Sequence, residues 1–214
     1  MDYKEIEYKY WAEELTKENF GRRIEAVVAN KRGILMPEAM YVVSCDDYYN
    51  YQNSDNNDFV RFRKGGGGYE LTLKRKEKEN VVRTEINLDV SGNEDSAIVE
   101  FLTLSGYAKS FQVYKEAWIW HFNDCVVSYY TLSDGRSVVE LEAINYNSIN
   151  EGIRIINKWE RELCIRDLTK EKRSLYEIFT QELQNKESNT MRLIKTMPDD
   201  VPPVRRTTKR GKSK

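Results

Sequence analysis

Apolar and polar residues alternate along much of this chain, which is the pattern of β-strands that bury one face. The first such run is EIEYKYW at residues 5–11, and two or three more strands are expected between Phe111 and Ile144. Polar or glycine segments, including the run from Gly65 to Gly68, separate the strands and predict the turns of an antiparallel meander. The strands between these two regions are predicted at residues 39–51, 58–64, 69–76 and 81–90.

Four other segments have the three- and four-residue apolar spacing of amphipathic helices. In the segment at 148–163, SINE at residues 148–151 has the capping-box pattern, and an apolar stripe follows it as far as Leu163. In the segment at 93–105, Asn93 is the expected N-cap and Gly106 is expected to end the helix. Helices are predicted at residues 16–28, where Thr16 is the N-cap, and at 93–105, 148–163 and about 170–187.

One face of the predicted sheet is charged, because side chains two residues apart on a strand point the same way. The solvated face of an ordinary antiparallel sheet would explain this pattern. However, the acidic pairs would repel each other unless a cation holds them, and the helices can cover only the apolar face. Closing the sheet on itself would turn the charged face inward and remove the sheet edges. The charged sets are Glu5, Glu7 and Lys9; Arg61 and Arg63; Glu70, Thr72, Lys74 and Lys76; Arg83 and Glu85; and Glu140 and Glu142.

The composition indicates one folded domain followed by a basic tail. Hydrophobic residues make up 40% of the 214 residues, which is enough for a single core. The last nineteen residues carry six cations and two anions, although the formal net charge of the whole chain is -1. We predict a domain of the α+β class, mostly antiparallel β, over residues 1–190, and a disordered basic tail over 191–214. RNA contact through Arg205–Lys214, plain disorder and an appended tag all remain open for this tail.

Several classes of protein are excluded by what the chain lacks. No apolar stretch reaches the roughly 20 residues of a membrane span, and the opening MDYKEIEYKY has no apolar signal-peptide core, so we expect a cytoplasmic protein. Cys45, Cys125 and Cys164 form no close pair, which argues against a disulfide framework and a cysteine zinc site. His121 is the only histidine, so a multi-histidine metal site is excluded. Carboxylates would have to hold any metal, which favours Mg²⁺, Mn²⁺ or Ca²⁺.

Seven short segments follow one another in the order of a known family. EIEYK at 5–9 resembles the ExExK signature of the CYTH superfamily, also called triphosphate tunnel metalloenzymes. This family includes thiamine triphosphatase, tripolyphosphatase and class IV adenylate cyclase. The other resemblances are CDDYYN (45–50) to D-x-Y-Y, VRFRK (60–64) to R-x-R, LKRK (73–76) to K-x-K, RTE (83–85) to R-x-E, VVELE (138–142) to E-x-E, and RSLYEIF (173–179) to a late S-Y helix.

The resemblance implies an eight-stranded closed β-barrel, or tunnel, with helices packed outside it. It implies a site for Mg²⁺ or Mn²⁺, with Glu5, Glu7, Glu140 and Glu142 as the metal ligands. The same four glutamates and Lys9 are the implied catalytic residues. The implied phosphate-binding residues are Lys9, Arg61, Arg63, Lys74, Lys76, Arg83 and Lys115.

The function that this resemblance favours is metal-dependent removal of the terminal phosphate from inorganic triphosphate, a nucleoside triphosphate or an RNA 5′-triphosphate. One alternative is a class IV-type adenylate cyclase, which makes cyclic AMP and pyrophosphate from ATP. Another is a non-catalytic module that sequesters a nucleotide or phosphorylated ligand. Two departures from the family pattern bear on this choice: Ala117 stands where a second cation often follows Lys115, and Tyr130 stands where an aspartate is common. A monomer and a homodimer are both open.

Overall fold

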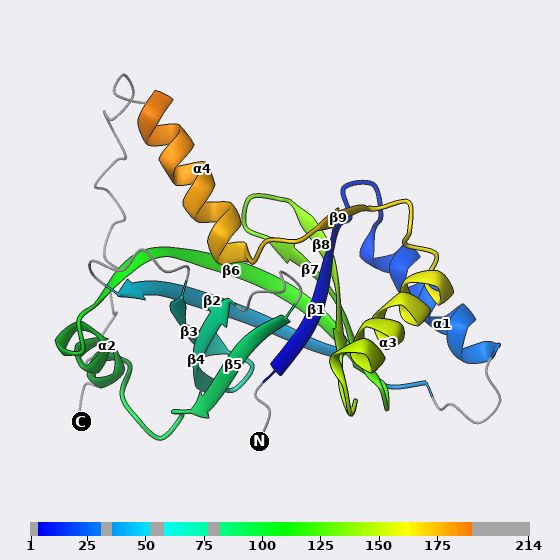
Figure 1. Ribbon diagram of the computed structural model, residues 1–214, viewed down its shortest axis with the longest axis horizontal. Helices are drawn as coiled ribbons and strands as arrows, with labels where there is room; N and C mark the ends of the chain where they lie inside the picture. Colours follow the sequence, from blue (N-terminus) through cyan, green and yellow to red (C-terminus); the bar gives the residue numbers. More distant parts are fainter. Residues whose placement is uncertain (1–3, 31–35, 52–57, 77–81, 190–214) are drawn as a thin grey trace, which may run out of the picture. The chain divides into compact units, whose positions relative to one another are not determined.

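A computed structural model describes residues 4–30, 36–51, 58–76 and 82–189 of the chain (Figure 1). The chain divides after Ile178 into two units. The first unit holds all the strands, the helices α1–α3 and the first turn of α4. The second unit is described only as far as Asn189, along α4 (Leu175–Asn189). The predicted tail at 191–214, with its basic run Arg205–Lys214, lies outside the described residues.

Eight antiparallel strands form a closed barrel. Their order around the barrel is β5-β4-β3-β2-β6-β7-β8-β1, and pairing of β1 with β5 completes the ring. This confirms the predicted fold class and the eight-stranded tunnel. The strands are β1 (Lys4–Trp11), β2 (Met40–Tyr51), β3 (Phe59–Gly65), β4 (Gly68–Lys76), β5 (Val82–Asp89), β6 (Tyr107–His121), β7 (Cys125–Leu132) and β8 (Ser137–Ala143).

The barrel closes through a short contact. Among the described residues, β1 pairs with β5 from Lys4 to Ile6, and further along β1 the residues Lys9 to Trp11 pair with a ninth strand, β9 (Thr169–Glu171). The prediction of a helix from about residue 170 is wrong at its start: Thr169–Glu171 form β9, and α4 begins at Leu175. The start of the predicted helix is a strand because the edge of β1 beyond Ile6 needs a hydrogen-bonding partner.

The glycine run makes a tight hairpin turn, as the sequence predicts. Gly65 and Gly68 are opposite each other at the ends of β3 and β4, so the loop consists of Gly66 and Gly67. Both loop residues have positive φ, 64° and 90°, which residues with a Cβ atom rarely adopt. The turn fixes the register that carries Arg61 and Arg63 opposite Thr72 and Glu70.

Two of the predicted helix caps are present and one is not. The Thr16 side chain accepts from the Asn19 N–H at the start of α1 (Lys17–Ala29), and Ser148 does the same for Glu151 in α3 (Ile149–Glu162). Helix α2 (Asp95–Leu104) begins after Glu94 rather than Asn93. The Asn93 side chain instead donates to the Val90 carbonyl, so it closes the preceding turn.

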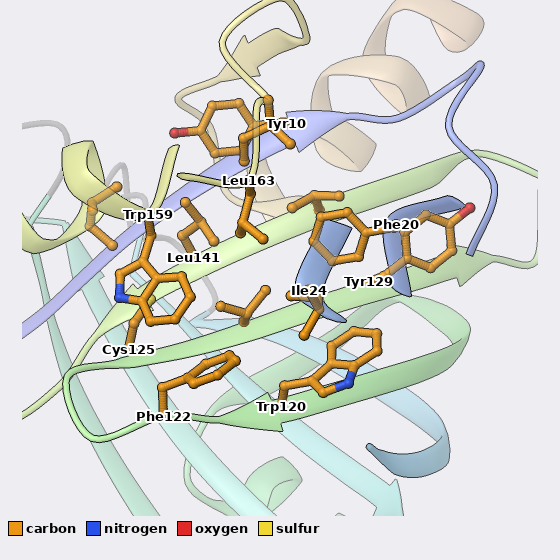
Figure 2. Close-up of a cluster of buried hydrophobic side chains, with 14 of the residues drawn as sticks. Tyr10, Phe20, Ile24, Trp120, Phe122, Cys125, Tyr129, Leu141, Trp159 and Leu163 are labelled. Atoms are coloured by element: carbon orange, nitrogen blue, oxygen red, sulfur yellow. The ribbon is translucent and has the colours of Figure 1, made fainter. Parts of the chain in front are cut away.

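The apolar face of the barrel points outward and packs under the helices. One cluster joins β1, β7 and β8 to α1 and α3, with Phe20, Leu141 and Trp159 at its centre (Figure 2). A second cluster places Ile98 and Leu102 of α2 over Phe62 of β3. The apolar side chains of these two clusters thus lie outside the barrel wall, and the charged face of the strands turns to the interior. Within the described ranges, no helix combines the length and the apolar character needed to cross a membrane.

Candidate functional site

The barrel encloses a cavity of about 180 Å³ that is lined from all eight strands. The two-residue period of each strand sends alternate side chains inward, and these are mostly the charged residues. Ser174 and Leu175 of the segment between β9 and α4 complete the lining. The predicted site residues that reach the cavity are Glu5, Glu7, Lys9, Arg61, Arg63, Lys74, Arg83, Lys115, Glu140 and Glu142.

Lys76 is the predicted phosphate-binding residue that lies elsewhere. Its ammonium group is 2.9 Å from Glu177 Oε1, and its side chain is 35% exposed. Lys76 is absent from the cavity lining formed by the described residues. It follows the inward-facing Lys74 by two positions, but β4 ends there, so Lys76 lies at the rim of the barrel.

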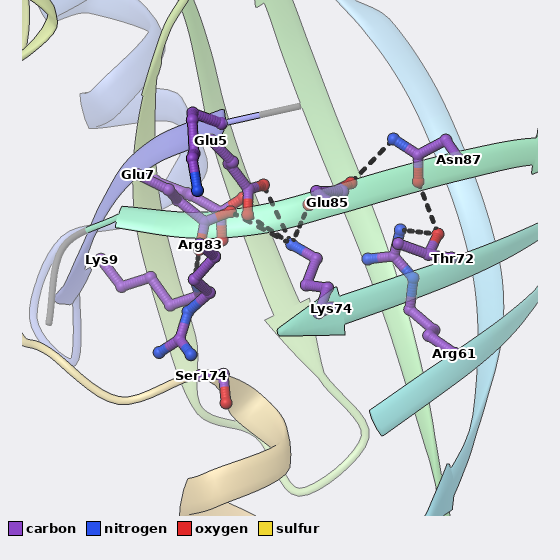
Figure 3. A network of polar contacts seen from close by, with 12 residues as sticks. Glu5, Glu7, Lys9, Arg61, Thr72, Lys74, Arg83, Glu85, Asn87 and Ser174 are labelled. Atoms are coloured by element: carbon purple, nitrogen blue, oxygen red, sulfur yellow. Dashed lines mark hydrogen bonds and ion pairs between the residues drawn. The ribbon is translucent and has the colours of Figure 1, made fainter. Parts of the chain in front are cut away.

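The first group of interior charges is here named the acidic cluster: Glu5, Glu7, Glu85, Glu140 and Glu142 with Lys9 and Lys74. Lys74 Nζ lies 2.9 Å from both carboxylate oxygens of Glu5 and 2.6 Å from Glu85 Oε2 (Figure 3). Burial lowers the pKa of Lys74, but Glu5 and Glu85 outweigh it and raise the pKa above its usual value. Lys74 is therefore a charged ammonium group between two carboxylates.

Lys9 links the other members of the acidic cluster. It forms an ion pair with Glu7, and its Nζ lies 3.4 Å from Glu140 Oε2. Burial raises the pKa of Glu140, but the charges of Lys9 and Lys115 hold it below its usual value. The Tyr130 hydroxyl also donates a 3.0 Å hydrogen bond to Glu140. Glu140 is thus an ionised carboxylate with one neutral donor and one ammonium group beside it.

Glu142 shows that the acidic cluster holds more negative charge than its lysines offset. Burial raises the pKa of Glu142 to about 8, and the nearby charges of Glu5, Glu140 and Glu85 add to this effect. Glu142 is also directly opposite Glu7 in the pairing of β1 with β8. Like charges held this close are stabilised by a cation between them.

The acidic cluster has the donor chemistry of a site for Mg²⁺ or Mn²⁺, because both ions prefer carboxylate oxygens. In the part of the chain that the structure describes, no three acidic, thiol or imidazole groups surround one point as metal ligands would. Lys9 and Lys74 take the places between the glutamates. Metal binding would therefore replace these lysine contacts of the carboxylates.

The second group of interior charges is here named the basic cluster: Arg61, Arg63 and Lys115 with Asp46 and Glu70. Arg63 donates two hydrogen bonds of 2.8 Å to Asp46, and Lys115 Nζ lies 3.1 Å from the same carboxylate. Asp46 is fully buried, which raises its pKa, but Lys115 and Arg63 hold that pKa far below its usual value. Asp46 therefore anchors two of the three cations.

Arg61 lines the cavity and has one buried N–H without a partner in the described chain. Its Nη2 donates to Glu70 at 2.8 Å and to Thr72 at 2.9 Å. Its Nε is buried and has no hydrogen-bond partner among the described residues. A buried N–H without an acceptor is costly. The phosphate-binding role of Arg61 stays a prediction, and the guanidinium lies at the cavity where that role requires it.

Ala117 and Tyr130, where the chain departs from the family pattern, both line the cavity and are opposite each other across β6 and β7. Lys115 Nζ lies 5.2 Å from the centre of the Tyr130 ring. Burial, and then the charge of Arg63, lower the pKa of Lys115 to about 8. The inward position of Ala117 means that the missing side chain would have been a further cation inside the tunnel.

Asp46, Glu85 and Glu177 contact the predicted site residues but were not predicted to belong to the site. Glu85 follows Arg83 by two positions on β5, so the alternation that selects Arg83 also selects Glu85. Asp46 lies within the D-x-Y-Y segment, two positions before the inward Tyr48. Glu177 lies in a helix that begins after the last strand, and no local pattern indicates its contact with Arg83.

Comparisons with known proteins agree with the fold and the sequence resemblance. The PH1012 protein of Pyrococcus horikoshii OT3 is 21% identical with a TM-score of 0.65, and the alignment covers 81% of this chain and 98% of that one. The PH1819 protein of the same organism is 18% identical with a TM-score of 0.64, covering 83% and 99%. A candidate adenylate cyclase of Vibrio parahaemolyticus is 14% identical with a TM-score of 0.61, covering 82% and 97%. No curated protein matches the chain. The family model for the CYTH domain matches residues 4–175, so this chain belongs to the CYTH domain family.

Proposed function

We propose that this protein is a divalent-metal-dependent hydrolase that removes the terminal phosphate from triphosphate-containing substrates. The observation that carries the proposal is the single cavity lined by both the acidic cluster and the basic cluster. Carboxylates suit a hard divalent cation, while arginine and lysine suit phosphate oxygens. A chain of phosphates with a bound cation has both kinds of charge.

The size of the cavity favours inorganic tripolyphosphate over larger substrates. Its volume is about 180 Å³. Pockets that enclose drug-sized ligands have volumes of roughly 300–1,000 Å³. A whole nucleoside triphosphate is of that larger class, whereas three linked phosphates are much smaller. Only the phosphate chain of ATP or of an RNA 5′-triphosphate would then lie in the cavity.

Each cluster has a separate role in this proposal. Glu5, Glu7, Glu140 and Glu142 would hold Mg²⁺ or Mn²⁺, and Glu85 adds a fifth carboxylate beside them. When bound, such a cation offsets phosphate charge and makes water a better nucleophile. Arg61, Arg83 and Lys115 would bind the phosphate oxygens and neutralise their charge as the terminal phosphoryl group transfers.

The reaction needs little covalent chemistry from the protein. Water attacks the terminal phosphorus in line with the bridging oxygen, a new P–O bond forms, and the bond to the bridging oxygen breaks. The products are orthophosphate and the shortened phosphate chain, whose bridging oxygen keeps the electron pair of the broken bond, and the proton lost by the water passes to solvent. Lys9, between Glu7 and Glu140, would lie beside the attacked phosphate, where burial lowers the pKa of its amino group.

Two alternatives rest on separate observations. The Vibrio parahaemolyticus neighbour, a candidate adenylate cyclase, supports a cyclase of ATP. Ala117 and Tyr130 inside the cavity support a module that binds a phosphorylated ligand without turnover. If the protein is such a module, the double change Ala117→Arg and Tyr130→Asp should produce some hydrolysis.

Product identification separates the three functions. The pure protein is incubated with tripolyphosphate, ATP or a 5′-triphosphate RNA in Mg²⁺ or Mn²⁺. We expect orthophosphate, with the highest rate for tripolyphosphate. Pyrophosphate together with cyclic AMP would show a cyclase instead. Tight binding of all three compounds without any product would show a sequestering module.

A further inference from the structure

The segment between β9 and the first turn of α4 follows the point along β1 where pairing with β5 ends and pairing with β9 begins. Ser174 and Leu175 of this segment line the cavity, and Glu177 follows in the first turn of the helix. Glu177 is absent from the cavity lining of the described residues, yet it contacts two cations at the ends of β4 and β5. Its function is therefore exerted through those cations.

The carboxylate of Glu177 is held at both oxygens. Oε2 accepts from Arg83 Nη2 at 2.9 Å, from the Ser174 backbone N–H at 2.7 Å and from the Ser174 hydroxyl at 3.0 Å. Oε1 accepts from Lys76 Nζ at 2.9 Å. Burial raises the pKa of Glu177, but hydrogen bonds from Lys76 and Ser174 and the charge of Arg83 hold it at about 2. Glu177 is therefore ionised at neutral pH.

Arg83 is the residue that connects Glu177 to the cavity. It is 7% exposed and lines both the main cavity and a small side cavity beside Lys9. Figure 3 shows its side chain extending from β5 toward Ser174. A guanidinium group has five N–H donors, and the contact with Glu177 uses one of them. The contact can therefore orient Arg83 without preventing it from binding a ligand.

In an alternative role, Glu177 would be displaced from Arg83 by the phosphate of a bound ligand. The contacts of Glu177 with Ser174 argue against it. The Ser174 hydroxyl accepts from the Glu177 N–H at 3.2 Å while Glu177 accepts from the Ser174 N–H, which is the reciprocal arrangement of a capping box. This fixes the carboxylate to its own helix turn, outside the cavity.

We propose that Glu177 is a positioning residue that holds Arg83 in the orientation that binds the phosphate chain. This inference rests on the proposed function, because it assumes that the cavity binds tripolyphosphate. The first turn of α4 would then contribute to ligand binding, because its Glu177 carboxylate orients Arg83 of β5.

The test is a double-mutant cycle on the full chain, with tripolyphosphate affinity measured by calorimetry and KM and kcat by orthophosphate release. Glu177→Gln should raise the dissociation constant and KM about tenfold while kcat changes less. In an Arg83→Ala background the same change should cost less than about twofold, because the residue being oriented is gone. Equal losses in both backgrounds, or unchanged affinity in folded Glu177→Gln, would overturn the proposal.

Glu18→Gln is the matched control, because Glu18 also lies in the first turn of a helix but its side chain is 68% exposed. It should leave the affinity within about twofold, since it removes only an exposed 3.9 Å ion pair with Lys17 and the interaction with the helix dipole. If thermal unfolding shows that Glu177→Gln does not fold, the cycle is run with Glu177→Asp, which keeps the charge and shortens the side chain. The absence of orthophosphate from the wild-type protein would contradict the hydrolase, whereas the calorimetric cycle still tests Glu177.

Discussion

The acidic cluster and the basic cluster line the same cavity but differ in the sign of the charge that is in excess. The acidic cluster has five glutamates and two lysines, and burial, together with the charges of neighbouring glutamates, raises the pKa of Glu142 to about 8. The basic cluster has three cations around the buried Asp46, and Arg61 keeps an N–H without a partner in the described chain. One cluster therefore has an excess of carboxylates and the other an excess of cations, and a metal-bound phosphate chain is a ligand that offsets both.

The largest effect is expected from removing one charge of the acidic cluster. Glu140→Gln should lower metal-dependent phosphate release on the order of a thousandfold, since the bound cation contributes several kcal/mol to such reactions. The fold should persist, because Gln keeps the shape and can still accept from Tyr130. Orthophosphate assays measure the first expectation and circular dichroism the second. Glu100→Gln on the exposed side of α2 is the control and should retain full activity.

The anchor of the basic cluster should matter for stability. Asp46→Asn should lower the free energy of unfolding by about 3 kcal/mol, because it removes a fully buried carboxylate and leaves the partly buried Arg63 and Lys115 without their counter-charge. Urea unfolding measures this value. Asp58→Asn is the control: its partner Arg75 has a side chain that is 62% exposed, so this surface pair should contribute less than about 1 kcal/mol.

The same aspartate predicts a pH dependence. Its pKa in the folded protein lies below that of an unfolded aspartate, about 3.9. The stability that Asp46 contributes is therefore complete above about pH 5 and is lost as the pH falls below 4. The difference in unfolding free energy between the wild type and Asp46→Asn should shrink over that range. A difference that stays constant down to pH 2 would contradict the ion pairs of Asp46.

Removing one ligand-binding cation should weaken binding without unfolding the protein. Arg61→Ala and Lys74→Ala should each weaken tripolyphosphate binding by about 1.5–3 kcal/mol, the usual contribution of a charge-assisted hydrogen bond. Calorimetry measures these losses. Arg75→Ala is the matched control, because Arg75 is next to Lys74 on β4 but its side chain is 62% exposed on the outer face. Equal affinities in all three variants would place the phosphate elsewhere.

The smallest effect is expected where the two clusters meet. Tyr130→Phe removes the hydroxyl that donates to Glu140 and should lower the unfolding free energy by about 1 kcal/mol. Tyr51→Phe, at an exposed tyrosine, should change it by less than about 0.5 kcal/mol. Thermal or urea unfolding of both variants would show the difference. Equal stabilities would mean that the Tyr130 hydroxyl contributes nothing in the folded protein.

The strands were predictable because their signal is local. Two-residue alternation and the glycine turn at Gly66 and Gly67 give the bounds of β3 and β4 to within a residue or two. β9 was not predictable, since TKE has no pattern of its own and forms a strand only because β1 offers an unpaired edge. The carboxylate partners of Arg63 and Arg83, which are Asp46 and Glu177, were also not predictable from the sequence. Local sequence shows which way a side chain points, but which carboxylate it contacts depends on how the barrel closes.

The most direct test of the two-cluster account is orthophosphate release from tripolyphosphate as Mn²⁺ is added to the metal-free protein. The wild type should be inactive without metal and active with it, and Glu5→Gln/Glu7→Gln should stay inactive at every Mn²⁺ concentration. Glu13→Gln/Glu14→Gln is the matched control, because it removes the same charge from two exposed glutamates just after β1 and should behave as the wild type. Full activity of the Glu5→Gln/Glu7→Gln protein would contradict the assignment of the acidic cluster as the metal site.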